Sequence, residues 1–257
     1  SGIYLTIDAE IQLAAEQTMR EVYASSGAKS VSCIVLDPQT FEILALVNYP
    51  SYDLNDVPRD DTETLNTLSR NKAVVDIYEP GSTFKVITAA INLEEYLNGN
   101  AAAFSPNYVF NSSRTRSVDG TTIKCWSDHK NGKHSHQTLA QALNNSCNPC
   151  FPDIALSLGK ETFYSYLSAF GFGNVTGIDF SGEAVGMLLP QSLVRNCDLA
   201  RIGFGQTIAV TQLQLACAVA AAVNGGNYYV PRLLKGVVTE DGSVEEIETI
   251  LKNKVIS

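Results

Sequence analysis

The sequence lacks both a membrane-spanning apolar stretch and an N-terminal signal sequence. No stretch of its 257 residues approaches the roughly 20 consecutive apolar positions that cross a bilayer. The longest apolar run, residues 213–223, is rich in alanine and is typical of a helix in a soluble domain. The first residues also lack a charged-then-apolar signal sequence. We therefore expect a soluble part of a larger protein.

Basic residues are scarce, with 18 Lys and Arg against 27 Asp and Glu, which gives a net charge of −9. Binding to phosphates needs clustered Lys and Arg, so this balance argues against nucleic acid as a partner. The sequence is 45% hydrophobic and 18% charged, and it contains no low-complexity tract. We expect one folded domain, or two subdomains, with a sizeable core.

Ser82 and Lys85 form a pair whose setting is unusual. Pro80 and Gly81 break the chain just before them, and the apolar residues of 84–91 predict a helix that begins at once afterwards. Residues three apart are neighbours on one helix face, so the Ser82 hydroxyl and the Lys85 amine should lie within reach of each other. The pair therefore joins a nucleophile to a potential base.

A serine hydroxyl attacks only after a base takes its proton, and a lysine amine can be that base only in its neutral form. Burial and the positive end of a helix both lower the pKa of a lysine, and the predicted setting supplies both. The spacing alone is a weak signal. Four other serines have a lysine three positions on, and we interpret them as surface pairs: Ser26/Lys29, Ser69/Lys72, Ser127/Lys130 and Ser157/Lys160.

A second candidate group is the tripeptide Ser146-Cys147-Asn148. It follows the amphipathic stretch 137–145, whose Asn-Asn-Ser end is typical of a turn. A hydroxyl and a carboxamide two positions apart on such a turn can pass a proton to a leaving group and hold a substrate amide.

Together these residues resemble a known pattern, because Ser-x-x-Lys and a Ser-x-Asn type of triplet belong to the signature of penicillin-binding proteins and class A β-lactamases. The sequence resembles the transpeptidase domain of class B, high-molecular-weight penicillin-binding proteins of the division and sporulation type. Four stretches carry the resemblance in the family's order: 35–38 with 43–45 and 50–53; 78–85; 143–149; and 203–206 with 210–211.

The resemblance implies an α+β fold of the β-lactamase/transpeptidase kind, in which helices flank an antiparallel sheet and a mostly helical subdomain is attached. We expect a partial transpeptidase domain over 1–257. Its sheet-side subdomain should comprise about 1–53 and 200–257, and its helical subdomain, of helices and long loops, about 54–199.

One element of the family pattern is missing, since no Lys-Thr-Gly, Lys-Ser-Gly or His-Thr-Gly occurs in the sequence. In the family this element follows a hairpin like the one predicted around Asp241-Gly242, and the sequence ends at Ser257 before reaching it. We therefore expect a truncated domain without its last sheet strands. The lost strand supplies one oxyanion amide in the family. Losing such a donor costs about 2.7–4 kcal/mol of barrier, so we expect weak activity or none.

The function that the resemblance implies is that of a serine D,D-transpeptidase that cross-links peptidoglycan stem peptides ending in D-Ala-D-Ala. Ser82 attacks the peptide, Lys85 accepts the serine proton, Ser146 protonates the leaving D-alanine, and Asn148 orients the lysine and the substrate amide. β-Lactam antibiotics would acylate the same serine. No cofactor and no metal is expected.

The resemblance also sets expectations for the parent protein. It would carry an N-terminal membrane anchor, which this sequence lacks, and lie on the extracytoplasmic face of the bacterial cell membrane. A glycosyltransferase is an expected partner there. The sequence leaves open a role in septation, elongation or sporulation. A sheet without its last strands has an open edge, so strand swapping between copies is also open.

The six cysteines support a rival interpretation, a non-enzymatic module with structural zinc. The residues that such a site would draw on are Cys125, His129, His134, His136, Cys147 and Cys150. An oxidising compartment favours instead a disulfide from Cys147 to Cys125 or Cys150. We interpret the other cysteines as small core residues, and they are Cys33, Cys197 and Cys217.

A third interpretation is a β-lactamase or a β-lactam sensor. Residues 94–98 read Glu-Glu-Tyr-Leu-Asn, which matches the Glu-x-x-Leu-Asn pattern that class A β-lactamases use for deacylation. In those enzymes the pattern follows the Ser-x-Asn triplet, whereas here it precedes it. We interpret the match as coincidence and expect the ester formed with penicillin to persist.

Residue patterns predict the elements around these groups. A helix capped by Thr6 or Asp8 should end at 25–27, and the serine helix should run to Leu97. Thr211 should cap a helix over 212–223. Two hairpins are predicted, at 31–37 with 42–49 and at 233–239 with 244–248.

Overall fold

The computed structural model describes residues 2–111, 113–126 and 134–257. The helices are α1 (Ala9–Ser26), α2 (Thr62–Leu68), α3 (Lys72–Val75), α4 (Lys85–Leu97), α5 (Leu139–Asn144), α6 (Cys150–Ala169), α7 (Asn196–Ile202) and α8 (Gln212–Val223), with 3-10 turns η1 (Gly81–Phe84) and η3 (Gln191–Leu193). The strands are β1 (Gly2–Leu5), β2 (Val31–Leu36), β3 (Ile43–Tyr49), β4 (Thr115–Val118), β5 (Thr121–Lys124), β6 (Met187–Leu188), β7 (Ile208–Ala209), β8 (Asn227–Tyr229), β9 (Leu234–Val238), β10 (Val244–Glu246) and β11 (Leu251–Lys254).

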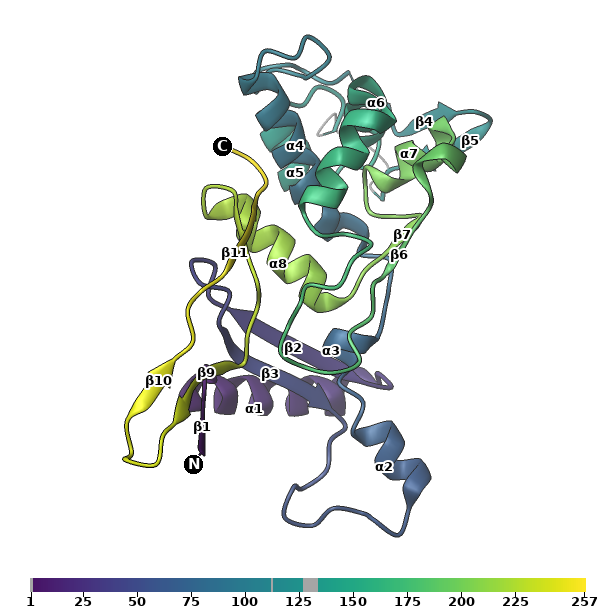
Figure 1. Ribbon diagram of the computed structural model, residues 1–257. Helices are drawn as coiled ribbons and strands as arrows, with labels where there is room; N and C mark the ends of the chain where they lie inside the picture. The colour runs from purple at the N-terminus through teal and green to yellow at the C-terminus, as the bar shows by residue number, and fades with distance from the viewer. Residues whose placement is uncertain (1, 112, 127–133) are drawn as a thin grey trace.

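The antiparallel hairpin β2–β3 forms the base of the molecule. Its register pairs Val31 with Tyr49 and continues to Val35 opposite Ala45. Along β3 buried and half-buried residues alternate, as the pleat of a strand requires. The helix α1 packs against one side of the hairpin and α8 against the other (Figure 1). The hairpin is therefore covered on both faces.

The upper part of the molecule is mostly helical and contains α4, α5, α6 and α7 (Figure 1). Ile87 and Ile91 of α4 are fully buried, and the helix contacts α5, α6 and α8. Because α8 contacts both α4 and β2, it joins the helical part to the hairpin below. One continuous hydrophobic core runs through both parts.

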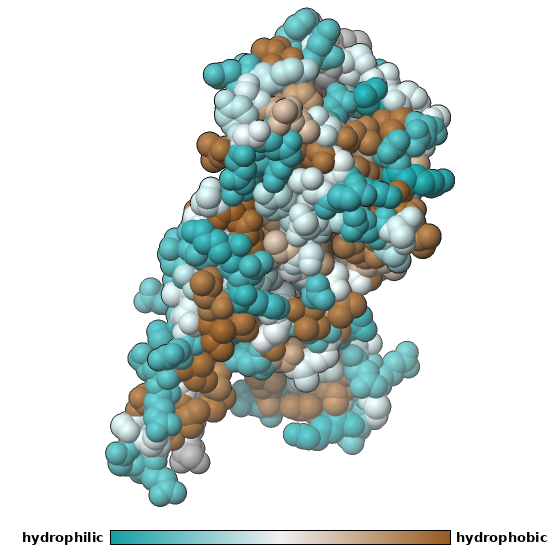
Figure 2. Space-filling view, turned by 45° about the horizontal axis from the view of Figure 1, so that its top comes forward, coloured by the Kyte–Doolittle hydropathy of each residue, from teal (hydrophilic) through white to brown (hydrophobic). Residues whose placement is uncertain are grey.

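A narrow arm extends from the base, where β1 and β10 pair antiparallel with the two sides of β9. Figure 2 shows apolar side chains along this arm, and the exposed ones are Ile3, Tyr4, Leu5, Val237 and Val244. A second antiparallel pair, β8 with β11, lies between the arm and the helical part.

Most of the predicted elements are confirmed. Asp8 caps α1 by accepting the N–H groups of Glu10 and Ile11, and Gly27 ends the helix in the left-handed conformation. Thr211 caps α8 in a capping box. The predicted α+β class is confirmed as well, while the boundaries of the two subdomains stay a prediction.

The prediction of only helices and loops over 54–199 was wrong at one place that concerns the site. Strands β4 and β5 form a hairpin there, joined by Asp119-Gly120. Both turn residues have positive φ, 47° and 76°, which is the geometry that Asp-Gly favours in two-residue hairpins. The strands are short and mostly polar, so their hydrophobic alternation is weak. None of the helices in these described ranges is long and apolar enough to span a membrane.

Candidate active site

Ser82 lies in the 3-10 turn η1, and Lys85 is the first residue of α4. The serine therefore stands just before the α-helix, one turn earlier than the sequence pattern indicates. The Lys85 backbone N–H bonds to the Ser82 carbonyl, which continues the turn into the helix. The side chain of Ser82 faces solvent, whereas Lys85 is fully buried.

The Lys85 amine is the centre of the site. Its Nζ lies 3.1 Å from Ser82 Oγ and 3.0 Å from Ser146 Oγ. It also lies 2.8 Å from the Ser146 carbonyl and 2.7 Å from Asn148 Oδ1. The structure thus brings all four predicted residues together, from two segments 61 or more positions apart.

Two of these four contacts fix the direction of the hydrogen bond. The Ser146 carbonyl and Asn148 Oδ1 carry no hydrogen, so both must accept from Nζ. A neutral amine has two N–H groups for these two acceptors and one lone pair that remains. The lone pair is then available to a serine O–H, and the Ser82 hydroxyl lies at hydrogen-bond distance from it.

The surroundings of Lys85 favour the same state. Burial lowers the pKa of Lys85 to about 8, because the apolar interior disfavours the ammonium. The neighbouring thiols of Cys147, Cys125 and Cys150 act in the opposite direction and raise this pKa, but burial outweighs them. A larger share of the lysine is therefore neutral near physiological pH than in water.

The turn that carries Ser146 and Asn148 begins where α5 ends. Thr138 and Gln141 form a capping box at the start of α5, and the short helix stops at Asn144. Ser146 then has φ of 50°, a backbone conformation that residues other than glycine rarely adopt. This reversal points the two side chains of Ser146 and Asn148 at Lys85.

The hairpin β4–β5 also holds the turn. Asn148 Nδ2 donates to the carbonyl of Lys124, at the end of β5, over 2.9 Å. Sequence reasoning missed this support because it placed no strands here. The Asp-Gly pair at 119–120 was the signal that could have found the hairpin.

The stretch 203–206 contacts the backbone just before Ser82, a role that the sequence did not predict. Gly81 N donates to the Gly205 carbonyl over 2.8 Å, and Thr207 N donates to the Glu79 carboxylate over 2.8 Å. A Cβ on Gly205 would lie 2.0 Å from the Gly81 carbonyl oxygen. Gly205 therefore allows the two backbones to meet directly beside Ser82.

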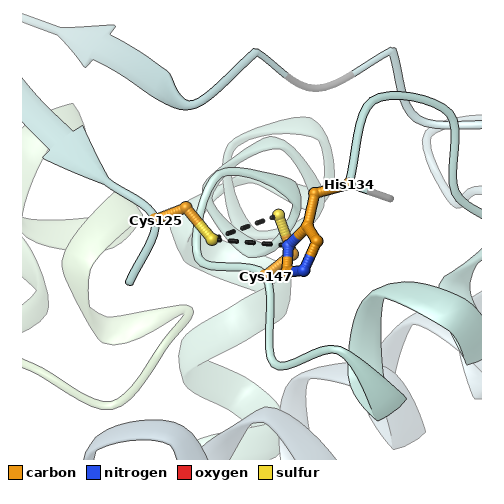
Figure 3. Close-up of side chains that lie close together, drawn as sticks. All are labelled: Cys125, His134 and Cys147. Atoms are coloured by element: carbon orange, nitrogen blue, oxygen red, sulfur yellow. Dashed lines mark hydrogen bonds between the residues drawn. The ribbon is translucent and has the colours of Figure 1, made fainter. Parts of the chain in front are cut away.

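The middle residue of the triplet, Cys147, is fully buried on the other side of the turn. Its sulfur lies 3.7 Å from that of Cys125, which in turn lies 3.6 Å from His134 Nδ1 (Figure 3). A hydrogen bond with the Cys150 thiol lowers the pKa of Cys147. None of the six cysteines forms a disulfide in the described structure. In the rival zinc set, His136 is exposed and His129 lies outside the described residues.

A buried lysine that joins two serines and an asparagine, carried on a mixed fold with antiparallel strands, defines a class of proteins built around a Ser-Lys pair. The comparison with family models places the chain within that class. The model described as "Penicillin binding protein transpeptidase domain" matches residues 31–257. The chain belongs to the penicillin-binding protein transpeptidase family.

Individual relatives agree. Stage V sporulation protein D of Bacillus subtilis is 36% identical over 255 residues, which cover 98% of this chain and 38% of that protein. Peptidoglycan D,D-transpeptidase FtsI of Escherichia coli is 29% identical over 227 residues, 88% of this chain and 36% of that protein. The chain thus spans less than two fifths of these relatives.

Solved structures give the same fold. Penicillin binding protein 3 of Mycobacterium tuberculosis, complexed with aztreonam, superposes with a TM-score of 0.86 at 28% sequence identity. The match covers 99% of this chain and 54% of that chain. The predicted β-lactamase/transpeptidase fold is confirmed by this likeness.

Proposed function

We propose that this chain carries the acyl-transfer centre of a serine D,D-transpeptidase that acts on peptidoglycan. One observation carries the proposal. The buried Lys85 amine lies between two serine hydroxyls, 3.1 Å from Ser82 and 3.0 Å from Ser146, and two further acceptors take its N–H groups. This geometry provides a nucleophile, its base and a second proton carrier in one group.

In the first half of the reaction Ser82 Oγ attacks the carbonyl of the penultimate D-alanine of a stem peptide. The neutral Lys85 amine takes the hydroxyl proton as the new C–O bond forms. We assign to the backbone N–H of Ser82 the role of a donor to the developing oxyanion. Asn148 Oδ1 holds the lysine in position throughout.

In the second part of this step the C–N bond breaks and the terminal D-alanine leaves as an amine. It needs one proton, which Lys85 passes on through the Ser146 hydroxyl. An ester between Ser82 and the stem peptide remains. The amine of a neighbouring stem then attacks this ester, restores the Ser82 hydroxyl and forms the cross-link. The atoms balance without a cofactor or metal in the reaction.

The substrate assignment rests on the relatives. The Escherichia coli relative is named as a peptidoglycan D,D-transpeptidase, and the mycobacterial structure holds aztreonam, a β-lactam. We infer the same substrate class, stem peptides ending in D-Ala-D-Ala, and acylation by β-lactams. We also infer from this substrate class that the protein containing this chain works on the extracytoplasmic face of the cell membrane, with a membrane anchor and a glycosyltransferase partner.

The ester formed with a β-lactam should persist, which separates this function from that of a β-lactamase. Glu94, the one carboxylate that matches a deacylation pattern, lies on α4 nine positions after Lys85, about 13 Å along the helix axis. Its carboxylate accepts the backbone N–H and the hydroxyl of Ser257. Glu94 is therefore remote from the Ser82 ester.

The test is the release of D-alanine from a synthetic stem pentapeptide, with and without an added acceptor amine. We expect release and, with the acceptor, a cross-linked product. Both should be lost in Ser82→Ala. The assay should run on this chain and on the longest product of its gene, so that a cleft completed by neighbouring sequence is also measured.

A matched control is Ser157→Ala, because Ser157 has the same spacing to Lys160 but lies on the exposed surface of α6. This variant should behave as the unchanged protein does. Rapid hydrolysis of penicillin would support a β-lactamase instead. Product formation that survives Ser82→Ala would refute the proposed centre.

A further inference from the structure

The strongest cluster of reactive side chains outside the proposed centre lies directly behind it. Cys125, His134 and Cys147 come from three separate segments, and each is at most 5% exposed. Their ligand atoms all lie within 4.8 Å of one another. Figure 3 shows the two sulfurs and the imidazole lying close together and facing one another.

The distances match those of a tetrahedral metal site. Zinc binds Cys sulfur at about 2.3 Å and His nitrogen at about 2.0–2.1 Å, so two sulfurs on one ion lie about 3.8 Å apart and a sulfur and a nitrogen about 3.6 Å apart. The observed separations are 3.7 Å between the sulfurs and 3.6 Å from sulfur to nitrogen. A disulfide requires about 2.05 Å, much shorter than the observed contact.

A fourth ligand is at hand. Cys150 is fully buried at the start of α6, and with Cys147 it forms the Cys-x-x-Cys spacing that is frequent in structural zinc sites. Its thiol interacts with that of Cys147. With its side chain turned toward the other three, Cys150 would complete a set of three thiolates and one imidazole.

A buried polar side chain lies beside the ligands, as the outer hydrogen-bonding partners do at metal sites. Gln137 is 1% exposed, and its Nε2 donates to the His134 carbonyl over 2.8 Å. The same nitrogen lies 4.0 Å from the Cys150 sulfur, and Gln137 Oε1 accepts from Asn145 Nδ2 over 2.8 Å. Gln137 therefore ties the His134 segment to the end of α5.

We propose that Cys125, His134, Cys147 and Cys150 bind one structural Zn²⁺ ion, which fixes the Ser146-Cys147-Asn148 turn against the β4–β5 hairpin. This inference is independent of the reaction proposed above, because the ion takes no part in that chemistry. Soft thiolates with one imidazole in a closed, buried site select zinc over magnesium or calcium, which prefer oxygen ligands.

The ion would position the proposed proton carriers. Cys147 separates Ser146 from Asn148, and Cys125 directly follows Lys124, whose carbonyl accepts from Asn148. An ion bound by both Cys147 and Cys125 would therefore hold the donor, Asn148, and the acceptor, Lys124, of that hydrogen bond in place. It would also hold Ser146 in its unfavourable backbone conformation, φ of 50°.

The first measurement is the metal content of the whole chain, purified without chelators after expression with added zinc. Elemental analysis should find about one zinc per chain. X-ray absorption at the zinc edge should show three sulfurs and one nitrogen. After zinc is removed under reducing conditions, titration with Co²⁺ should give the intense visible bands of tetrahedral thiolate coordination. This readout requires no variant, so it stands even if substitutions unfold the protein.

Matched variants locate the ligands. His134→Ala should weaken zinc binding by at least about tenfold, whereas His136→Ala, two positions on and exposed, should leave it unchanged. Cys125→Ser should behave as His134→Ala does. Its control is Cys197→Ser, since Cys197 is also buried but lies on α7, outside the cluster.

Removal of zinc should lower the thermal midpoint by at least about 5 °C, and added zinc should restore it, because the ion binds only the folded chain. Three results would each overturn the proposal. They are a chain that neither retains nor binds zinc, an intact mass two hydrogens short that maps to a bond between Cys125 and Cys147, and zinc binding that His134→Ala and Cys125→Ser leave unchanged.

Discussion

The two sides of the Ser146–Asn148 turn differ in chemistry although they lie one residue apart. On one side, Ser146 and Asn148 contact the Lys85 amine through oxygen atoms. On the other, Cys147 meets Cys125 through sulfur and lies beside His134. The oxygen side reaches Ser82, which faces solvent, whereas each side chain of the sulfur side is at most 5% exposed.

This difference shows how one turn can serve two purposes. In this turn Ser146 and Asn148 point toward Lys85, whereas Cys147 between them points away, so the triplet can present polar groups to a substrate and be anchored by its middle residue. The anchor matters because the turn has a strained backbone at Ser146 and belongs to no long element. Substitutions that affect only the oxygen side or only the sulfur side therefore test whether the two sides act independently.

The largest expected effect comes from Lys85→Met, which disables the oxygen side alone. Methionine fills a similar volume in the fully buried site but provides no base. Acylation by penicillin should slow by about 10²–10⁴-fold, measured by stopped-flow or by mass spectrometry over time. Lys160→Met, with the same spacing to Ser157, is the control. An acylation rate in Lys85→Met that equals the control's would remove the lysine from the mechanism.

A change of pH should have the next largest effect. Lysine is neutral above its pKa, and burial lowers the pKa of Lys85 to about 8. Below pH 8 the neutral fraction, and with it the rate of acylation, should fall about fivefold to pH 7 and about 50-fold to pH 6. The measurement is the acylation rate across this range, with far-UV circular dichroism to show that the fold persists. A flat profile would contradict the assignment of Lys85 as the base.

Gly205→Ala should disturb the oxygen side through the backbone. The new Cβ would lie 2.0 Å from the Gly81 carbonyl oxygen, so the segment before Ser82 must move. We expect a loss of about 2–4 kcal/mol in the free energy of unfolding, measured with urea, together with slower acylation.

Gly225→Ala is the control for Gly205→Ala. Both glycines have φ of 84°, but a Cβ on Gly225 would meet nothing within 4 Å. Only the cost of the left-handed conformation, about 1–2 kcal/mol, should remain there. Equal losses in the two variants would show that the contact with Gly81 is unimportant.

The smallest expected effect is that of Asn148→Ala, which removes one of the two acceptors of the lysine N–H groups and the bond to the Lys124 carbonyl. A hydrogen bond of this kind contributes about 1 kcal/mol, so acylation should slow roughly fivefold. Asn144→Ala, on the exposed side of α5, should leave the rate unchanged. An unchanged rate in Asn148→Ala would show that Asn148 does not position Lys85.

The sequence predicted the oxygen side well and the sulfur side poorly, for a physical reason. The pair Ser82 and Lys85 is local, so helical spacing and the Pro-Gly break suffice to place it. Residues 146 and 148 are distant in sequence, and only the resemblance to a family connected them with Lys85. The cysteine cluster depends on where the β4–β5 hairpin packs, and short polar strands carry little hydrophobic signal.

In the rest of the fold, too, local features were predicted and contacts between distant segments were not. Helices with clear caps, such as α1 and α8, were predicted to within a few residues, because a cap is a local hydrogen bond. The contact of Gly205 with Gly81 could not be predicted, since it joins backbones 124 positions apart. The positive φ of Phe41, 58° in the β2–β3 connection, could not be predicted either, because residues other than glycine rarely adopt this conformation.

The most direct test of the central claim, that Ser82 is a nucleophile activated by Lys85, is peptide mapping by tandem mass spectrometry after brief exposure to penicillin at pH 8. The account predicts one adduct with the full mass of the drug, located on Ser82 and absent when Lys85 is replaced by methionine. An adduct on any other residue, or one of equal yield without the lysine, would contradict it.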